Sequence, residues 1–148
     1  MINDCSVEID APPSLVWAVY ADTERWSDWT ASIERIVPLQ GPQLEIGSRF
    51  EIKQPRLPAL AWEVTELEVG RSWTWVQRSP GGTTVATHEV VPLDGDRTLV
   101  RQRLEQRGPV GVVVAWLMRR TTKRYLHLEA QGLKARSEQG LRHDAPSA

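Results

Sequence analysis

The fold of this chain is decided by residues 70–109, which read GRSWTWVQRSPGGTTVATHEVVPLDGDRTLVRQRLEQRGP. Residues 72–78, 83–91 and 98–106 alternate with a period of two, as strands with one buried face do. Pro80-Gly81-Gly82 and Asp94-Gly95-Asp96 separate these segments. Short connections rich in glycine form hairpins. The stretch therefore predicts consecutive antiparallel strands, a β-meander.

Before this stretch, the same alternation predicts four more strands, at residues 5–10, 33–39, 49–53 and 61–69. Two short helices are expected between the first and second of these strands. Pro12-Pro13 suits the first turn of one helix, where a missing N–H costs nothing. Asp22 or Thr23 can cap a second helix through Trp26 and Trp29, which lie three apart and share a face.

After Gly108-Pro109, apolar residues recur three or four apart, which predicts one long amphipathic helix to about Glu138. Two adjoining rows form its apolar face: Val110, Val114, Leu117, Thr121, Tyr125 and Leu128 in one, and Met118, Thr122, Leu126 and Leu133 in the other. The opposite side is basic and contains Arg119, Arg120, Lys123 and Arg124. Such a cluster is usually a solvated face, although it is also able to contact phosphate or lipid headgroups.

Length and composition exclude several classes of protein. A chain of 148 residues fits one domain, which we place at residues 1–139, followed by a flexible tail at 140–148. The 18 basic and 19 acidic residues nearly balance, which argues against general attraction to nucleic acid. The single Cys5 excludes an internal disulfide. No apolar run is long enough to cross a bilayer and no signal peptide is visible, so we expect a cytoplasmic protein without integral membrane contact.

Seven tryptophans are present, against one phenylalanine and two tyrosines. Trp73 and Trp75 lie two apart on a predicted strand, so both rings turn to one face of the sheet. Rings of this size are usually core packing. Two of them on one face, with few charged neighbours, also suit the wall of an apolar cavity. The alternation leaves open which face of its strand His88 occupies.

Several segments, in this order along residues 3–138, resemble the START-like, or SRPBCC, superfamily, close to its polyketide cyclase/dehydrase group. The segments are residues 11–17 (APPSLVW), 26–29 (WSDW), 47–50 (GSRF), 62–67 (WEVTEL), 70–75 (GRSWTW), 88–93 (HEVVPL), the 95–100 turn, and 129–134 (EAQGLK). No single segment is diagnostic, but their order is specific for the fold.

The resemblance implies an α+β helix-grip fold, in which a curved antiparallel sheet wraps around a long C-terminal helix and two short helices follow the first strand. It also implies a cavity between sheet and helix that binds a hydrophobic or aromatic molecule, such as a lipid or polyketide. The ligand-binding residues predicted for this chain are Trp62, Trp73, Trp75, His88, Leu117, Thr121 and Tyr125. The indoles would supply contact area, while His88, Thr121 and Tyr125 would orient a polar end.

Three alternatives accompany this prediction. His88 is able to serve as the acid/base residue of a polyketide cyclase or dehydratase, since histidine titrates near neutral pH. Alternatively, His88 is a core histidine that forms a hydrogen bond with a neighbour such as Gln102. Trp26, Trp29 or the basic helix face could instead contact a protein partner, so a monomer and a homodimer both remain open. No cofactor is expected, and no metal, because His127 and Glu129 lie two apart on a helix and diverge.

Overall fold

Seven antiparallel strands form one sheet in a computed structural model, which describes residues 1–40 and 43–144. The elements, in chain order, are β1 (Ile2–Ile9), α1 (Pro13–Ala21), the 3₁₀-helix η1 (Thr23–Asp28), β2 (Arg35–Gln40), β3 (Arg49–Lys53), β4 (Leu60–Glu68), β5 (Ser72–Ser79), β6 (Gly82–Leu93), β7 (Arg97–Arg107), α2 (Pro109–Leu117) and α3 (Arg119–Asp144). The predicted strands and short helices are all present. The helix-grip architecture is confirmed.

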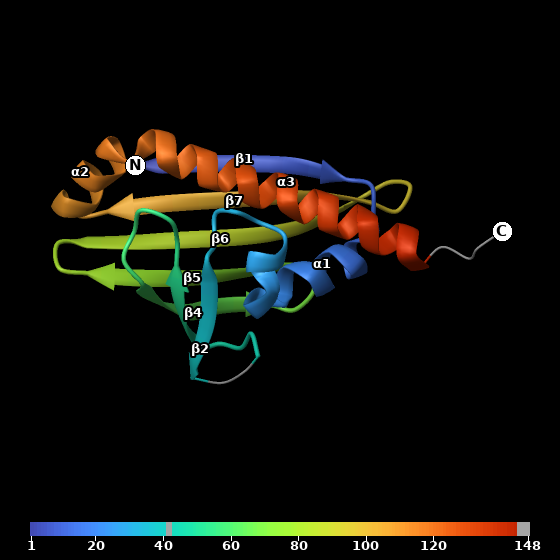
Figure 1. The fold of residues 1–148 in the computed structure, drawn as a ribbon, viewed down its shortest axis with the longest axis horizontal. Coiled ribbons are helices and arrows are strands. Elements are labelled where there is room, and N and C mark those ends of the chain that lie inside the picture. The colour runs from blue at the N-terminus through green and yellow to red at the C-terminus, as the bar shows by residue number, and fades with distance from the viewer. Residues whose placement is uncertain (41–42, 145–148) are drawn as a thin grey trace.

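The strand order is β1-β7-β6-β5-β4-β3-β2, so the first strand pairs with the last (Figure 1). Val7 lies opposite Val100 in this pairing. From β1 the chain passes through α1 and η1 to β2, at the other edge of the sheet. The helices cover one face of the sheet and leave the other to polar side chains and cross-strand ion pairs such as Arg101–Glu89.

The C-terminal helical region is broken, which corrects the prediction of one continuous helix. Met118 ends α2, and α3 begins at the next residue in a different direction (Figure 1). The break follows from two separate attachments. The start of α2 is fixed to the β5–β6 hairpin, because the backbone N–H groups of Val110 and Gly111 donate to the Gly81 carbonyl at 3.0 and 3.3 Å. By contrast, α3 packs along β1 and α1.

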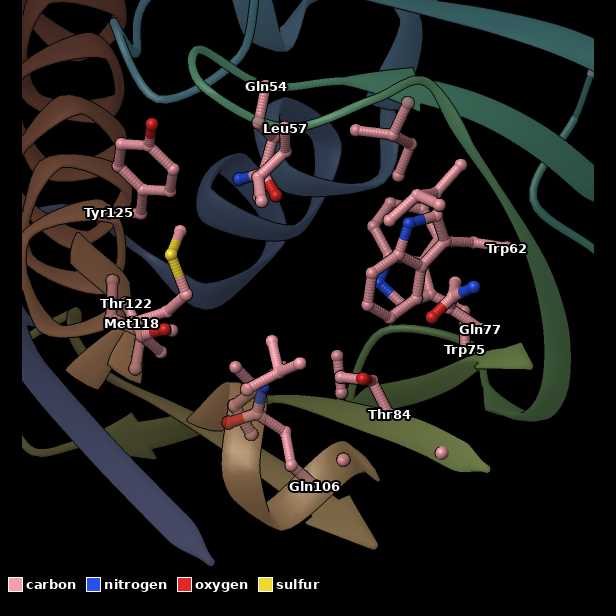
Figure 2. A pocket seen from close by; sticks show the side chains of 18 of the residues that line it. Gln54, Leu57, Trp62, Trp75, Gln77, Thr84, Gln106, Met118, Thr122 and Tyr125 are labelled. Atoms are coloured by element: carbon pink, nitrogen blue, oxygen red, sulfur yellow. The ribbon is translucent and has the colours of Figure 1, made fainter. Parts of the chain in front are cut away.

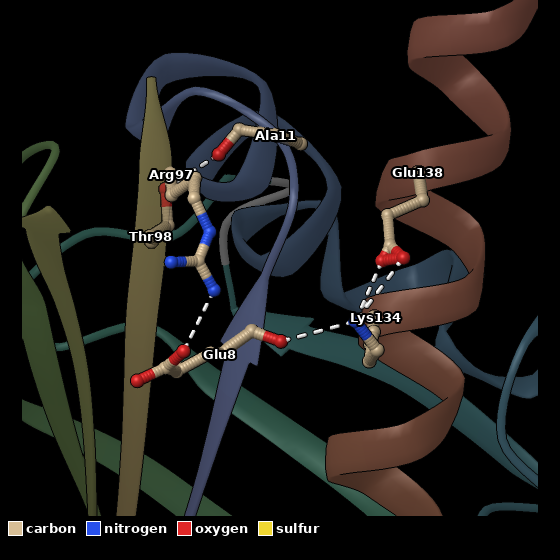
Figure 3. Close-up of polar contacts among 6 residues, drawn as sticks. All are labelled: Glu8, Ala11, Arg97, Thr98, Lys134 and Glu138. Carbon is tan, nitrogen blue, oxygen red and sulfur yellow. Dashed lines mark hydrogen bonds and ion pairs between the residues drawn. The ribbon is translucent and has the colours of Figure 1, made fainter. Parts of the chain in front are cut away.

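Polar contacts secure α3 and the end of β1 at the other end of the sheet (Figure 3). Lys134 Nζ donates to the Glu8 carbonyl at 3.2 Å and pairs with Glu138 at 2.8 Å. The buried Thr98 hydroxyl donates to the Ala11 carbonyl at 2.8 Å, just after β1. Gly132 allows a close approach here, since a Cβ at this position would collide with the Trp29 carbonyl. These contacts press α1, η1 and the middle of α3 onto the sheet.

The C-terminal helix is longer than expected. It continues to Asp144, past the predicted end at Glu138, so residues 140–144 are helical where the sequence suggested a tail. Residues 145–148 of that predicted tail lie outside the described residues. No helix within the described residues is both long enough and apolar enough to cross a membrane.

Candidate functional site

A cavity of about 330 Å³ lies between the sheet, the α2–α3 corner and the loop that joins β3 to β4 (Figure 2). The sheet contributes aromatic and amide side chains, and the helices contribute aliphatic and hydroxyl side chains. Five of the seven predicted ligand-binding residues line it: Trp62, Trp75, His88, Thr121 and Tyr125. The cavity is therefore placed where the resemblance implied, between sheet and C-terminal helices.

The aromatic wall is formed by Trp62 and Trp75, whose ring centroids lie 6.1 Å apart at an interplanar angle of 49°. Trp62 is on β4 and Trp75 on β5, and both labelled rings stand together in Figure 2. Trp26 reaches the same cavity from η1. Trp26 is only 1% exposed, so it cannot provide the partner-binding surface that was one alternative.

Trp73 does not line this cavity, which corrects its predicted ligand-binding role. Its ring is 1% exposed and packs in the core, 4.7 Å from Tyr20 and 5.7 Å from Trp17 by ring centroids. The two side chains share a face of β5, as predicted. However, α1 covers Trp73, whereas the space in front of Trp75 stays partly open.

Leu117 does not line the cavity either, because the break after α2 changes the phase of the helix. Its side chain is 66% exposed. Met118, Thr122 and Leu126, from the adjoining row, take the cavity positions beside the predicted Thr121. Figure 2 shows Met118 and Thr122 on this side of the cavity. Val110 and Val114 line the cavity from α2.

Tyr125 crosses the edge of the cavity and bonds to the loop between β3 and β4. Its hydroxyl donates a hydrogen bond to the Pro55 carbonyl. Gln54 and Leu57 of the same loop face Tyr125 across the cavity in Figure 2. The hydroxyl predicted to orient a ligand is therefore engaged with the protein, and it holds the loop against α3.

His88 is a buried histidine that also borders the cavity. Its ring stacks on Trp73 at a centroid distance of 4.2 Å and an angle of 13°. Nδ1 lies 3.3 Å from the Trp73 carbonyl, to which a neutral ring donates, leaving Nε2 as an acceptor. Burial lowers the pKa of His88 from 6.5 to about 3, against the smaller opposite effect of that hydrogen bond. His88 therefore stays neutral at physiological pH and does not suit the predicted role of an acid/base residue that titrates near neutral pH.

Glu129 is the ionisable residue of the cavity that the sequence analysis missed. It is buried, and its carboxylate accepts a hydrogen bond from Gln102 Nε2 at 2.9 Å. Burial raises the pKa of Glu129 to about 7, while hydrogen bonds from Gln102 and Ser32 act in the opposite direction. The helical spacing could have identified it. Glu129 lies three residues after Leu126 and four before Leu133, so it belongs to the same row on the helix as Thr122, Leu126 and Leu133. A charged residue in such a row is buried with it.

Two amide side chains, Gln102 and Gln106, lie beside the cavity with oxygens that lack a donor among the described residues. Gln102 Nε2 uses its two hydrogens on Glu129 and on the Tyr20 hydroxyl, the latter at 3.0 Å. Within the described part of the chain, Gln102 Oε1 and Gln106 Oε1 are buried without a partner. Both residues line the cavity. A buried acceptor without a donor is costly, about 1–3 kcal/mol, so a ligand donor that reached either oxygen would stabilise the complex.

The described residues contain no group of three His, Cys, Asp or Glu side chains able to hold a metal ion. The chemical groups available in the cavity are thus one carboxyl group that titrates near neutral pH, one neutral imidazole, amides and hydroxyls. Such a set is able to bind a polar end of a ligand and to move a proton.

A family described as polyketide cyclase / dehydrase and lipid transport matches residues 4–138. No curated protein matches. Among solved structures, the Zhui aromatase/cyclase from Streptomyces sp. R1128 has a TM-score of 0.78 at 17% identity, covering 99% of each chain. A START superfamily protein from Mycobacterium smegmatis has a TM-score of 0.69 at 21% identity, covering 93% of this chain and 97% of its own.

Norcoclaurine synthase from Thalictrum flavum, solved with dopamine and hydroxybenzaldehyde, has a TM-score of 0.73 at 14% identity, covering 99% of this chain and 89% of its own. Identities this low establish a shared fold and not a shared reaction. The family match spans nearly the whole chain and includes the sheet, the cavity and most of α3. This chain belongs to the polyketide cyclase / dehydrase and lipid transport family.

Proposed function

We propose that this protein binds an apolar or aromatic small molecule, lipid-like or polyketide-like, in the cavity between its sheet and C-terminal helices. The observation that carries the proposal is the cavity of about 330 Å³ with two indoles on one wall. Mostly apolar walls with a few placed polar groups are typical of small-molecule sites. A cytoplasmic location, and the choice between monomer and homodimer, stay predictions.

The polar end of the ligand is proposed to carry hydrogen-bond donors. Gln102 Oε1 and Gln106 Oε1 have no donor within the described residues. A phenol or alcohol placed there would satisfy an oxygen that is otherwise buried and unpaired. An ether of the same shape would leave it unpaired, which costs about 1–3 kcal/mol and so about tenfold or more in affinity.

A titration with 2-naphthol and 2-methoxynaphthalene, followed by tryptophan emission, tests both parts of the proposal. We expect saturable quenching by both probes, with 2-naphthol binding about tenfold more tightly. Gln106→Leu should reduce this preference, because it removes one of the acceptors. Gln54→Leu is the matched control: Gln54 lines the same cavity but is half-buried, so water can satisfy its amide.

The absence of saturable binding by either probe would contradict the cavity-binding function. Equal affinity for the two probes, with saturable binding, would contradict only the donor requirement. The two parts of the proposal therefore fail separately.

A second candidate function, a cyclase or dehydratase, is favoured by the carboxyl group of Glu129. Its pKa of about 7 suits proton transfer at neutral pH better than the pKa of about 3 at His88. Glu129 therefore replaces His88 as the proposed acid/base residue. Whether a natural substrate undergoes such a reaction depends on its identity, so the reactivity of the carboxylate is tested with a model compound.

The probe is 5-nitrobenzisoxazole, whose ring N–O bond breaks when a base removes the proton from C3, releasing a coloured phenolate. We expect the protein to accelerate this reaction with a rate that rises with pH around an apparent pKa near 7. Glu129→Gln should abolish the acceleration. Equal rates in the wild type and Glu129→Gln would rule out Glu129 as an accessible base, without affecting the binding proposal.

A further inference from the structure

Helix α2 is apolar on all sides, yet most of it faces outward. Its nine residues read PVGVVVAWL. Six of its side chains are between 42% and 66% exposed: Val110, Val112, Val113, Val114, Trp116 and Leu117. Ala115 is its buried residue. Val110 and Val114 also line the ligand cavity, but Val112, Val113, Trp116 and Leu117 do not. Large contiguous apolar patches are rare on monomeric soluble proteins, so these four side chains require an explanation that the cavity does not supply.

The chain around α2 is strongly basic, although the whole protein has a net charge of −1. Between Glu105 and Glu129 there are five basic residues and no acidic ones. Arg119, Arg120, Lys123 and Arg124 occupy the first turns of α3, and all four are exposed. The Arg119 guanidinium lies 4.9 Å from the centre of the Trp116 ring, which places the positive charge directly beside the apolar helix.

This basic group is not neutralised by neighbouring carboxylates. The ion pairs within the described part of the chain involve acids elsewhere, and none includes Arg120, Lys123 or Arg124. These three residues are spaced to share one face of α3. An exposed row of positive charge beside exposed valine, leucine and tryptophan matches the chemistry of an anionic lipid surface.

We propose that α2 and the first turns of α3, residues 109–124, form a docking surface for an anionic phospholipid bilayer. Val112, Val113, Leu117 and Trp116 would enter the headgroup–acyl boundary, and the basic residues would contact the phosphate and carboxylate groups of the lipids. A helix of nine residues is roughly 14 Å long, so it lies on a bilayer rather than across it.

A second copy of the chain fits this surface less well. A symmetric dimer through α2 would place the same patch on both subunits. The two basic rows would then lie close together without acidic partners, and like charges repel. The inner side of α2 lines the ligand cavity through Val110 and Val114. A bilayer bound at this surface would therefore lie directly over the helix that closes the cavity.

Vesicle flotation of the full chain tests the proposal. We expect binding to vesicles of equal parts phosphatidylcholine and phosphatidylserine at low salt, and little binding to phosphatidylcholine alone. The double variant Val113→Asp/Leu117→Asp, and separately Arg120→Glu/Lys123→Glu, should each weaken binding about tenfold or more. All four residues are exposed, so the fold should survive these changes.

Two matched controls make the comparison specific. Val69→Asp introduces a charge at a side chain that is 78% exposed, in the β4–β5 turn at the end of β5 away from the hairpin that holds α2. Arg136→Glu reverses an exposed charge near the other end of α3. Both controls should bind vesicles as the wild type does. Raising the salt concentration should release the wild type, because screening weakens exposed charges.

Three results would overturn the proposal. The first is no flotation with either kind of vesicle. The second is equal binding by the controls and the α2–α3 variants. The third is a concentration-dependent dimer in sedimentation that Val113→Asp/Leu117→Asp converts to a monomer, because the surface would then be occupied by a second copy.

Discussion

The two ends of one sheet face differ in what lies opposite them. At the packed end, Trp73 and His88 are enclosed by rings from α1 and η1, with Tyr20 and Trp26 within 6.0 Å of the Trp73 ring. At the open end, Trp62 and Trp75 face the α2–α3 corner and a loop, and a cavity of about 330 Å³ remains. Trp73 and Trp75 lie on the same strand and the same face, two residues apart.

The comparison shows that the helices covering the sheet, and not the strand itself, determine where the cavity lies. The hydrogen bond from Thr98 to the Ala11 carbonyl holds the start of α1 to the sheet, and the one from Trp26 to the Tyr20 carbonyl holds η1 to α1. Gly132 lets α3 approach the end of η1. At the other end, α2 is held by the β5–β6 hairpin and turns away from α3. Side chains of the same size therefore fill the space at one end and only line it at the other.

The largest expected effect comes from truncating the two tryptophans of β5. Trp73→Ala should lower the free energy of unfolding by about 3–5 kcal/mol, because it empties a fully packed site. Trp75→Ala should cost less, since part of its ring already faces a cavity. Urea unfolding measures both. Binding of 2-naphthol should change strongly in Trp75→Ala and little in Trp73→Ala; the opposite pattern would contradict the division into two ends.

The Trp→Phe pair provides a milder version of this test if either alanine variant fails to fold. Trp73→Phe should again be the more destabilising of the two, and Trp75→Phe the one that alters probe binding.

The next effect concerns Glu129, which lies where the two ends meet. Its folded pKa of about 7 exceeds the ordinary value of 4.5, so the folded state holds a proton that the unfolded state releases. The contribution of Glu129 to the free energy of unfolding is fully present below pH 4.5 and is lost as the pH rises through about 7. Glu129→Gln removes this loss. The stability of the variant relative to wild type should therefore rise by up to about 3 kcal/mol between pH 4.5 and 8.

His88 changes the free energy of unfolding with pH in the opposite direction to Glu129, so it provides a comparison within the same protein. Its pKa falls from 6.5 to about 3 on folding, so its stabilising contribution is present above pH 6.5 and is lost on acidification. Between pH 4.5 and 6.5 the two groups oppose each other in the wild type. Urea unfolding of Glu129→Gln in this range should show stability that increases with pH. Parallel profiles for variant and wild type would show that Glu129 is not perturbed by burial.

The strands could be predicted closely from the sequence because their signals are local. Residues 72–78, 83–91 and 98–106 were expected, and the structure has β5 at Ser72–Ser79, β6 at Gly82–Leu93 and β7 at Arg97–Arg107. Alternation fixes which side chains share a face, and the turns fix where strands end. Both depend on a few neighbouring residues.

The break at Met118 could not be predicted in this way, because it depends on contacts between distant segments. The helical period alone continues through Met118, and only the attachment of α2 to Gly81 separates the two helices. Leu117 was placed in the cavity on the assumption of an unbroken helix. Trp73 was also placed in the cavity. The alternation predicts which face of the sheet its side chain occupies, but it does not predict that α1 packs over that side chain.

A smaller effect is expected where α2 meets the hairpin. A methyl group at Gly82 would lie 2.9 Å from the Gly111 nitrogen, a backbone atom that cannot move without shifting α2. Gly82→Ala should therefore cost about 1–3 kcal/mol and alter probe affinity at the open end. Gly111→Ala is the control, since its Cβ would lie 3.4 Å from the Gly82 Cα, which is ordinary contact. Equal losses in the two variants would mean that α2 is not held by this close approach.

The smallest expected effect is the loss of one hydroxyl at the edge of the cavity. Tyr125→Phe removes the hydrogen bond to the Pro55 carbonyl and should lower the free energy of unfolding by about 1 kcal/mol. Because this bond ties the β3–β4 loop to α3, its removal should also speed the release of 2-naphthol, measured by stopped-flow fluorescence. Thr121→Val removes another hydroxyl from the lining but leaves the Tyr125–Pro55 bond intact. If both variants released the probe equally fast, the β3–β4 loop would not control access to the cavity. The position of α2 would then be the only feature of this comparison that keeps the cavity open.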